Sequence, residues 1–348
     1  MTKPVILTGL RANQNLTIGN YFGAILPIID MAKKRSDEYQ INMFIPDLHS
    51  FTTPVDHSIL NKQIFDNARI YVAAGLPLNN ENIYLYRQSY IPAHSELTVI
   101  LNCFTGFGEM SRMTQFKEKR SSIGEDRTSV GLFGYPVLMA SDILLYNAKY
   151  VPVGDDQTQH LEFTRDIAER MNKKFQQDLF VVPEPVAKQH EFFGKDQGLR
   201  IKDLIDPTKK MSKSDESGRG VIFLNDNPEI AYKKVMSATT DNKAEIHFDR
   251  DNQPGISNLL EILSLLQGLT LQKIIDTYEG KTKYSDFKVV VAEEVKQFLT
   301  NFQIALSNVD DNDAILAKLI QSEQDLTPIA NTTLLRVQQA VGLRLKDK

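Results

Sequence analysis

Short strand-like runs alternate with helical patterns over the first half of the chain, and this order limits the fold more than any other feature. The runs are rich in Ile, Val and Tyr, and the segments between them repeat apolar residues at helical spacing. A β-α-β-α order favours a parallel sheet with helices on both faces. We expect strands at 4–9, 41–47, 82–88 and 150–154, and helices at 18–35, 56–74, 93–105 and 131–147.

The strand-like runs fade at about residue 220, and helical patterns then continue to the end of the chain. At 348 residues the chain is longer than one typical compact domain, so two domains are expected. We place the change of domain where the pattern changes. In the helix expected at 56–74, Asp56 is the predicted N-cap and Gly75 the stop.

Composition excludes several classes of protein. The single cysteine, Cys103, excludes an intramolecular disulfide, and without a Cys-x-x-Cys pair a structural zinc site is disfavoured. We expect Cys103 to be buried. No segment is apolar enough for a signal peptide or a membrane span, so we expect a cytoplasmic protein without membrane contact. A net charge of −4 gives no sign of a DNA partner, although a local basic patch is compatible with RNA binding.

The turn after the first expected strand is long and polar and enters its helix at about residue 18. Ligands of parallel sheets bind at the carboxyl ends of the strands, so this turn is a candidate site. It has neither the Walker spacing nor the dinucleotide fingerprint. Thr17 is a suitable N-cap, and Gly19 leaves space beside N–H groups that favour phosphate, but a helix start of this kind also occurs without a ligand.

A second turn, at 151–160, enters a helix through Asp155 and Asp156. Adjacent carboxylates at a helix N-terminus can complement the helix dipole. They can equally hold ribose hydroxyls or an ammonium group. The residues alone leave both interpretations open.

The segment 204–215, LIDPTKKMSKSD, gathers Lys209, Lys210 and Lys213 on a loop with little apolar material. One interpretation is a solvated surface turn. The other is a phosphate-binding loop, because a lysine carries a compact charge on a long stem and can follow phosphate oxygens as charge moves.

An acidic residue interrupts the apolar helix expected at 131–147. Met139, Asp142 and Ile143 stand at helical spacing i, i+3 and i+4 and therefore share one face. A carboxylate on such a face is costly unless a group donates to it. A ligand N–H is one candidate donor, and a structural ion-pair or backbone partner is the other.

Two motifs together carry a resemblance to a known family. KMSKS at 210–214 and TIGN at 17–20, in place of the usual His-Ile-Gly-His, resemble the paired signature of class I aminoacyl-tRNA synthetases. Within that class the chain resembles the bacterial-type tryptophanyl-tRNA synthetases over most of its length. The stretches that carry this likeness are 16–24, 108–119, 135–172, 206–215 and 254–263.

The resemblance implies a fold and an activity. It implies an α/β fold in which a Rossmann-like, nucleotide-binding domain is followed by an all-helical domain that recognises the tRNA anticodon. The implied ranges are 1–190 for the catalytic domain, 191–220 for a linker with the lysine loop and 221–348 for the helical domain. The implied reaction uses ATP and Mg²⁺, which is held by the ATP phosphates without a protein metal site, to join L-tryptophan to tRNA(Trp). A homodimer is also implied.

The resemblance assigns roles to individual residues. Lys210, Lys213, Thr17 and Asn20 would be catalytic. The implied ATP site contains Arg11, Ala12, Asn13, Thr17, Gly19, Asn20, Gly154, Asp155, Asp156, Ile201, Lys210, Met211, Ser212, Lys213 and Ser214. The implied tryptophan site contains Leu7, His49, Tyr135, Met139, Asp142, Ile143, Val151, Val153 and Gln157.

Several positions depart from the pattern of the family. Arg11, in RANQ at 11–14, replaces a neutral amide near the phosphates, and Leu7 stands where an aromatic residue often stacks on the indole. His49 is retained while its neighbours differ, so it is either a site residue or a satisfied core histidine. The segment 186–199 before the lysine loop is longer than expected. Two rival functions stay open: a tyrosine-specific relative, and a catalytically silent paralogue that binds RNA or an amino acid.

Overall fold

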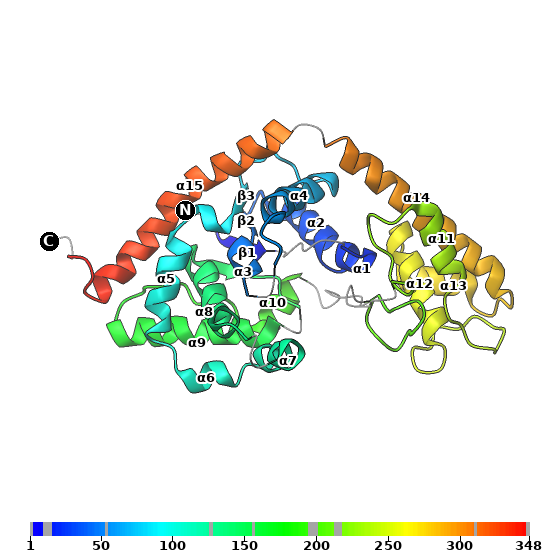
Figure 1. The fold of residues 1–348 in the computed structure, drawn as a ribbon, viewed down its shortest axis with the longest axis horizontal. Helices are drawn as coiled ribbons and strands as arrows, with labels where there is room; N and C mark the ends of the chain where they lie inside the picture. The colour runs from blue at the N-terminus through cyan, green and yellow to red at the C-terminus, as the bar shows by residue number, and fades with distance from the viewer. Residues whose placement is uncertain are drawn as a thin grey trace.

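A parallel sheet forms the centre of the N-terminal part of the molecule (Figure 1). The computed structural model describes residues 3–9, 16–52, 55–124, 128–154, 157–193, 201–211, 218–309 and 312–345. Within these residues four strands pair in the order β3-β2-β1-β4, and all the pairs are parallel. The strands are β1 (Val5–Gly9), β2 (Gln40–Ile45), β3 (Ile83–Arg87) and β4 (Ala148–Tyr150). The predicted α/β class is therefore confirmed.

The first three predicted strands are confirmed to within two residues, but the fourth is misplaced. β4 ends at Tyr150, so most of the run predicted at 150–154 lies beyond the sheet. Pro152 lacks the N–H that a ladder position needs. The Val151 N–H donates instead to Oε1 of Gln189 at 3.0 Å. The chain thus leaves the sheet early and enters the second polar turn.

Both faces of the sheet are buried. Along β1, Ile6 belongs to one apolar core and Leu7 to another, and along β2 Met43 and Phe44 divide in the same way. Successive side chains of a strand point to opposite faces, so each core covers one face. This arrangement confirms the expected sheet with helices on both sides.

The helices between the strands lie close to their predicted positions. The helical segment predicted at 18–35 is continuous but changes its hydrogen-bonding pattern along its length. It comprises α1 (Ile18–Asn20), a π-helical turn (Tyr21–Ile25) and α2 (Leu26–Arg35). The other helices of this part are α3 (Asp47–Ser50), α4 (Leu60–Ala73), α5 (Ala93–Asn102), α6 (Phe107–Ser111), α7 (Thr114–Ile123), α8 (Val130–Leu145), α9 (Thr158–Phe175) and α10 (Val186–Phe193). We call the sheet with α1 to α10 the sheet unit.

Two local predictions about this part were wrong. Asp56 does not cap α4, because that helix begins at Leu60, and the Asp56 carboxylate accepts from the Ser58 N–H at 2.9 Å in a turn before the helix. Cys103 is exposed rather than buried, since it follows the last turn of α5. The stop at Gly75 is confirmed by its positive φ of 97°.

The helices after the lysine loop form a second cluster, which we call the helical unit. It contains α11 (Pro228–Met236), α12 (Pro254–Gln267), α13 (Leu271–Tyr278) and α14 (Tyr284–Ser307). Helix α14 packs on α11 and α12. Helix α12 is the centre of the unit, because its residues 255–264 are all buried. Among the described residues, no helix is long and apolar enough to cross a membrane.

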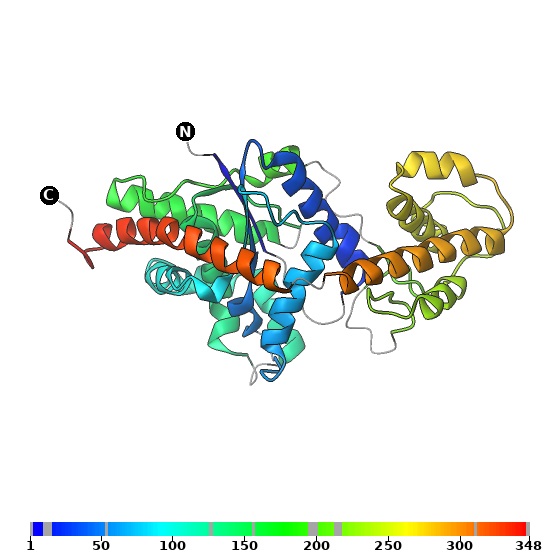
Figure 2. The same ribbon diagram turned by 90° about the horizontal axis from the view of Figure 1, so that it is seen from above.

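The last helix, α15 (Asn312–Ala340), returns to the sheet unit. Figures 1 and 2 show α14 and α15 following one another across the length of the molecule, with α15 beside the sheet. It packs on β3 and α5, and Ser322 Oγ accepts from the Leu85 N–H at 3.1 Å. Arg87 donates to both carboxylate oxygens of Glu323 at 2.7 Å. The helices after residue 221 therefore divide between the two units: α11 to α14 form the helical unit, and α15 packs on the sheet unit.

Candidate active site

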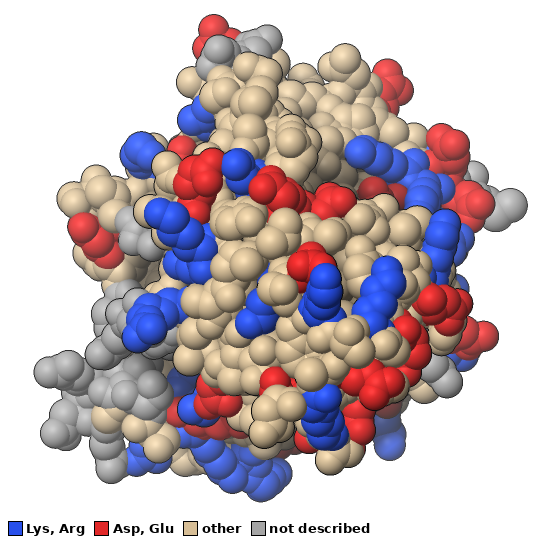
Figure 3. Space-filling model, turned by 90° about the vertical axis from the view of Figure 1, so that its right-hand side faces the viewer, with Lys and Arg blue, Asp and Glu red and all other residues tan. Residues whose placement is uncertain are grey.

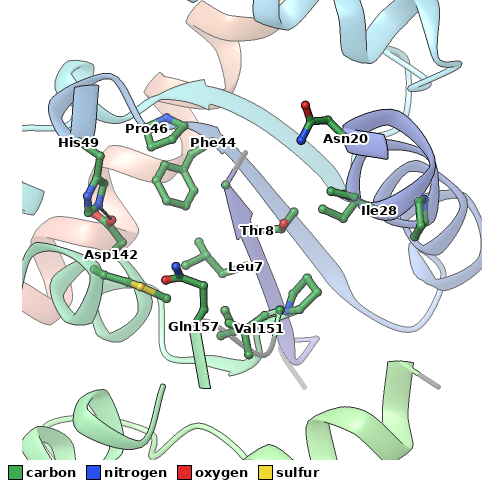
Figure 4. Close-up of a pocket in the computed structure, with 18 of the residues that line it drawn as sticks. Leu7, Thr8, Asn20, Ile28, Phe44, Pro46, His49, Asp142, Val151 and Gln157 are labelled. Carbon is green, nitrogen blue, oxygen red and sulfur yellow. Dashed lines mark hydrogen bonds and ion pairs between the residues drawn. The ribbon is translucent and has the colours of Figure 1, made fainter. Parts of the chain in front are cut away.

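A cavity of about 440 Å³ opens at the carboxyl ends of β1 and β4 (Figure 4). From β1 the chain continues on one side to β2 and β3, whereas β4 lies on the other side of β1. This reversal creates a crevice at the ends of the central strands, which is where open α/β sheets bind their ligands. The walls come from β1, α1, α8, the turn after β4 and the segment before the lysine loop.

The fold brings nearly all of the described predicted site residues into this one cavity. Thr17 is the exception, because it caps α1 and does not line the cavity. The lining residues are Leu7, Gly19, Asn20, His49, Tyr135, Met139, Asp142, Ile143, Val151, Val153, Gly154, Gln157, Ile201, Lys210 and Met211. The remaining predicted residues lie outside the described part of the chain: Arg11, Ala12, Asn13, Asp155, Asp156, Ser212, Lys213 and Ser214.

The TIGN motif forms a capping box at the start of α1. Thr17 Oγ1 accepts from the Asn20 N–H at 3.2 Å, and Asn20 Oδ1 accepts from the Thr17 N–H at 3.0 Å. The predicted N-cap is thus confirmed. A Cβ on Gly19 would lie 3.7 Å from Cβ of Ile201, so the glycine faces the segment that precedes the lysine loop. The helix start and that segment form one end of the cavity.

The base of the lysine loop is held by backbone pairing. Lys202 and Lys210 form an isolated antiparallel bridge, and the Met211 N–H donates to the Ile201 carbonyl at 3.0 Å. This pairing directs Lys210 to the cavity while Lys209 forms an ion pair with Asp206 at 2.8 Å outside it. The base of the loop therefore makes specific contacts that its composition did not indicate.

The helical unit supplies the support for this base. Asn258 of α12 is buried and bonds both backbone groups of Lys202, accepting from its N–H at 2.8 Å and donating to its carbonyl at 3.0 Å. The Thr239 N–H donates to the Leu204 carbonyl at 2.7 Å. A Cβ on Gly255 would come within 2.0 Å of the Thr239 carbonyl oxygen, so a side chain at this position of α12 would displace Thr239.

A second backbone contact ties the chain after the loop to α1. The Ile18 N–H donates to the Ile222 carbonyl at 3.0 Å, and the Leu224 N–H donates to the Leu16 carbonyl at 2.8 Å. The start of α1 and the return from the lysine loop are consequently neighbours. The two signature motifs, almost two hundred residues apart in the sequence, are joined by hydrogen bonds at their flanks.

Asp142 lies across the cavity from Asn20 and is buried, with 1% of its surface exposed (Figure 4). His49 Nε2 lies 2.9 Å from its Oδ2, and Figure 4 shows these side chains facing each other. His94 Nδ1 and Gln88 Nε2 lie 2.6 and 2.7 Å from Oδ1. Burial opposes ionisation, but the hydrogen bonds from His49 and His94 outweigh it and hold the pKa of Asp142 below its ordinary value. The site therefore presents a charged acceptor.

Sequence reasoning missed the residues behind Asp142. Gln88 and His94 are fully buried and come from the segment after β3, and Tyr146 follows α8. The available signal was the position of Gln88 at the end of a predicted strand, where site residues of parallel sheets gather. His94 gave no comparable signal, because a single histidine in a helix occurs in many structural contexts.

Several other residues of the cavity wall were also missed, and Lys119, Phe44 and Phe193 are three of them. Lys119 of α7 places Nζ 4.5 Å from the centre of the Tyr135 ring, which adds a cation to the cavity. Phe44 lies beside Leu7, and a Cβ on Gly9 would come within 2.5 Å of its ring. β2 thus supplies an aromatic ring next to the position where β1 carries Leu7. Phe193 ends α10 and also lines the cavity.

Helix α10 accounts for the first part of the long segment at 186–199. Its Gln189 is buried and donates to the carbonyls of Glu184 and Lys149 at 2.9 and 3.2 Å. Phe192 stacks on Tyr150, with 3.8 Å between ring centres. The helix is therefore fixed against the end of β4. The rest of the segment lies outside the described residues.

Comparison with known proteins agrees with this geometry. Residues 2–300 match the family model described as tRNA synthetases class I (W and Y). The chain belongs to this family. It is 40% identical over 342 residues to the tryptophan–tRNA ligase of Caldanaerobacter subterraneus subsp. tengcongensis, and the match covers 98% of this chain and 99% of the relative.

Solved structures show the same relationship. Tryptophanyl-tRNA synthetase from Mycoplasma pneumoniae superposes with a TM-score of 0.83 at 34% identity, over 99% of both chains. The enzyme from Campylobacter jejuni, solved with ADP and tryptophan, gives a TM-score of 0.77 at 28% identity over 97% of this chain and 99% of the other. The family resemblance noted in the sequence is thereby confirmed.

Proposed function

We propose that this protein ligates L-tryptophan to tRNA(Trp) in two steps. ATP and tryptophan first form tryptophanyl-adenylate and pyrophosphate, and the tryptophanyl group then passes to the 3′-terminal ribose of the tRNA. One observation carries the proposal: a buried, ionised Asp142 and the signature Lys210 line the same cavity, in which Asp142 lies across from Asn20 of the other signature motif. The names of the full-length relatives support the same assignment.

The amino acid lies at the Asp142 end in this proposal. An indole N–H donates and cannot accept, so it complements a carboxylate that can only accept. Oδ2 already receives a hydrogen bond from His49 and retains acceptor capacity for the indole N–H. The walls of this end are Leu7, Tyr135, Met139, Ile143, Val151, Val153 and Gln157. Phe44 contributes the aromatic surface that Leu7 lacks.

The nucleotide occupies the other end. Gly19 and Ile201 form a narrow apolar wall for the adenine, and Asn20 and Gly154 lie at its border. Thr17 acts through the cap that fixes Asn20. Lys210 and, by resemblance, Lys213 contact the phosphates, and Lys119 adds a further cation on the same cavity. The roles of Asn13 on the phosphates and Asp156 on the ribose are likewise proposed by resemblance.

The first step needs neither a covalent enzyme intermediate nor a general base. The tryptophan carboxylate attacks the α-phosphorus in line, the bond to pyrophosphate breaks, and negative charge moves to the leaving oxygens. The chain contributes positioning and charge, with Asp142 and Asn20 orienting the two substrates and Lys210 stabilising the charge that develops.

In this proposal Mg²⁺ binds together with ATP, through the phosphate oxygens. No group of three metal-ligating side chains occurs within the described ranges, whereas phosphate oxygens are suitable ligands for the ion. When bound, Mg²⁺ supplies additional neutralisation of the phosphate charge.

The proposal includes three further properties taken from the family resemblance. The helical region from residue 221 onward recognises the anticodon, the protein acts as a homodimer, and it works in the cytoplasm. Figure 3 shows Lys and Arg interspersed with Asp and Glu on the outer face of the helical unit. A face of mixed charge favours recognition by shape and individual contacts over recognition by one large basic surface.

ATP–pyrophosphate exchange tests the proposed activity. Exchange should require Mg²⁺ and tryptophan, and tyrosine and phenylalanine should support it far less. Faster exchange with tyrosine would assign the chain to the tyrosine-specific branch of the family. Absence of exchange with every amino acid would support a silent paralogue that only binds.

A further inference from the structure

The hydrogen bonds to Oδ1 of Asp142 come from side chains that are held by partners of their own. Gln88 donates to Oδ1, and its Oε1 accepts from the Leu48 N–H at 3.2 Å. His94 Nδ1 contacts the same oxygen, and its Nε2 lies 2.9 Å from the Tyr146 hydroxyl. Neither donor lines the cavity, whereas His49, the partner of Oδ2, does. Oδ1 therefore accepts hydrogen bonds from side chains behind the cavity wall, whereas Oδ2 accepts from a side chain that lines the cavity.

His94 is enclosed by aromatic rings and has no exposed surface. The ring centres of Phe44, Tyr86 and Tyr146 lie 6.4, 6.1 and 5.5 Å from the centre of its imidazole. Water therefore does not replace either of its polar partners. In such surroundings each ring nitrogen must match its one partner in hydrogen-bonding sense.

The two partners determine where the proton of His94 lies. The low pKa of Asp142 keeps its carboxylate ionised, so it only accepts and Nδ1 must carry a hydrogen. Burial raises the pKa of Tyr146 well above its ordinary value, so its hydroxyl keeps the proton and can donate to Nε2. A neutral imidazole with its hydrogen on Nδ1 satisfies both ends.

We propose that Tyr146 and His94 are positioning residues for substrate selection, in which the Tyr146 hydroxyl holds His94 as the neutral Nδ1–H tautomer and His94 holds Asp142 with Oδ2 toward the ring N–H of the bound amino acid. Without the hydroxyl, Nε2 has no hydrogen-bond partner inside its aromatic enclosure, and the imidazole loses the contact that holds Nδ1–H against the carboxylate. Asp142 would lose one of the donors that orient it. This inference rests on the proposed tryptophan specificity.

The experiment compares two amino acids of the same shape. L-tryptophan has the ring N–H, and 3-benzothienyl-L-alanine has a sulfur atom in its place and no donor. The ratio of their kcat/KM values in ATP–pyrophosphate exchange reports on the hydrogen bond to Asp142. Tyr146→Phe and His94→Leu should each lower this ratio about tenfold or more, with the KM for ATP unchanged. His94→Asn places an amide N–H near the position of Nδ1–H and should recover part of the ratio.

Tyr84→Phe is the matched control. It removes the hydroxyl of a half-buried tyrosine in β3 that is not a partner of His94. It should leave the ratio at the wild-type value. A wild-type ratio in Tyr146→Phe would overturn the inference. A parallel loss of activity with both amino acids and a lowered melting temperature would overturn it too, because that result indicates a structural role.

A spectroscopic measurement tests the tautomer independently of catalysis. The chain has six histidines, and ¹⁵N labelling of histidine distinguishes the two neutral tautomers and the imidazolium by their nitrogen shifts. The signal that is absent in His94→Asn should be that of an Nδ1–H tautomer, and it should change in Tyr146→Phe. An imidazolium or an Nε2–H form at His94 would overturn the inference. The wild-type protein could show the Nδ1–H signal but no ATP–pyrophosphate exchange with tryptophan. That result would contradict the proposed function and leave the assignment of the His94 tautomer intact.

Discussion

The two ends of the cavity are held in place by different kinds of contact. At the end proposed for the amino acid, Asp142 is fixed by buried side chains, including Gln88 and His94, that belong to the sheet unit. At the end formed by the lysine loop, where we propose that the phosphates bind, Lys210 is exposed, and the backbone beside it is fixed by Asn258 of the helical unit. One end is therefore complete within a single core, whereas the other depends on a contact between two units.

We therefore expect the Asp142 end to select the amino acid and the lysine loop to stabilise the charge that develops during the reaction. A buried network fixes one acceptor before the ligand arrives, and such a site can reject a ligand that lacks the matching donor. A lysine on a supported loop can follow phosphate oxygens during the reaction but contributes little to the choice of amino acid. Substitutions at the two ends should accordingly change different kinetic constants.

The largest effect is expected for Asp142→Ala. A site built around one hydrogen bond rejects an analogue without the donor by about 10⁴-fold, so the preference for tryptophan over phenylalanine should fall by about 10³-fold or more. ATP binding should stay nearly intact, because the nucleotide site that we propose lies at the other end. The measurement is kcat/KM for the two amino acids in wild type and variant. Asp142→Asn, which keeps an acceptor but loses the charge, should give an intermediate value.

An unchanged preference in Asp142→Ala would show that Asp142 is a structural partner of His49 and His94 only. The Asp142 end would then have no role in selecting the amino acid, and the two ends would no longer differ in function.

Lys210→Ala and Lys213→Ala should each lower the rate of adenylate formation by about 10²–10³-fold, because in the proposed mechanism each removes a donor that stabilises charge on the leaving pyrophosphate. The KM for tryptophan should change little. Lys209→Ala is the matched control, since Lys209 pairs with Asp206 outside the cavity and its loss removes the same charge from the same loop. Equal losses in all three variants would support the solvated-turn interpretation of the loop.

Asn258→Ala tests the contact between the units. A backbone group left unpaired in a buried position costs about 1–3 kcal/mol, and a shift of the Lys202–Lys210 bridge should lower adenylate formation about tenfold. The KM for tryptophan should remain constant. Ser264→Ala removes a buried hydroxyl from the other end of α12, where it donates to the Leu269 carbonyl at 2.8 Å, and should leave the rate unchanged. A similar loss of rate in both variants would mean that α12 stabilises the fold without positioning the loop.

The smallest effect is expected for Thr17→Ala. Loss of an N-cap side chain destabilises a protein by about 1 kcal/mol, and Thr17→Ser should recover most of this because its hydroxyl can accept from the Asn20 N–H. Denaturant unfolding gives the stability, and the KM for ATP shows whether Asn20 has moved. A large change in the KM for ATP with unchanged stability would instead indicate that the Thr17 hydroxyl contacts the nucleotide directly.

Features that depend on neighbouring residues could be predicted from the sequence. The Thr17 cap and the Gly75 stop involve residues within one helical turn of the element that they end, and both are confirmed. Local reasoning failed where a partner distant in the chain, or the surroundings, decided the outcome. At the end of β4, the Val151 N–H donates to Gln189, and Cys103 is exposed because no described segment covers the end of α5 at that point.

The sequence by itself determined the parallel α/β architecture, the two signature motifs and the residue types that the proposed chemistry needs. Periodicity and turn residues act over a few positions, so they can be read without a structure. Only the tertiary structure decided the partners of Asp142, which lie 48, 54 and 93 residues away in the chain at His94, Gln88 and His49. It likewise placed α15 on the sheet and Asn258 under the lysine loop. Such contacts depend on how the elements pack in space, and no local pattern encodes that packing.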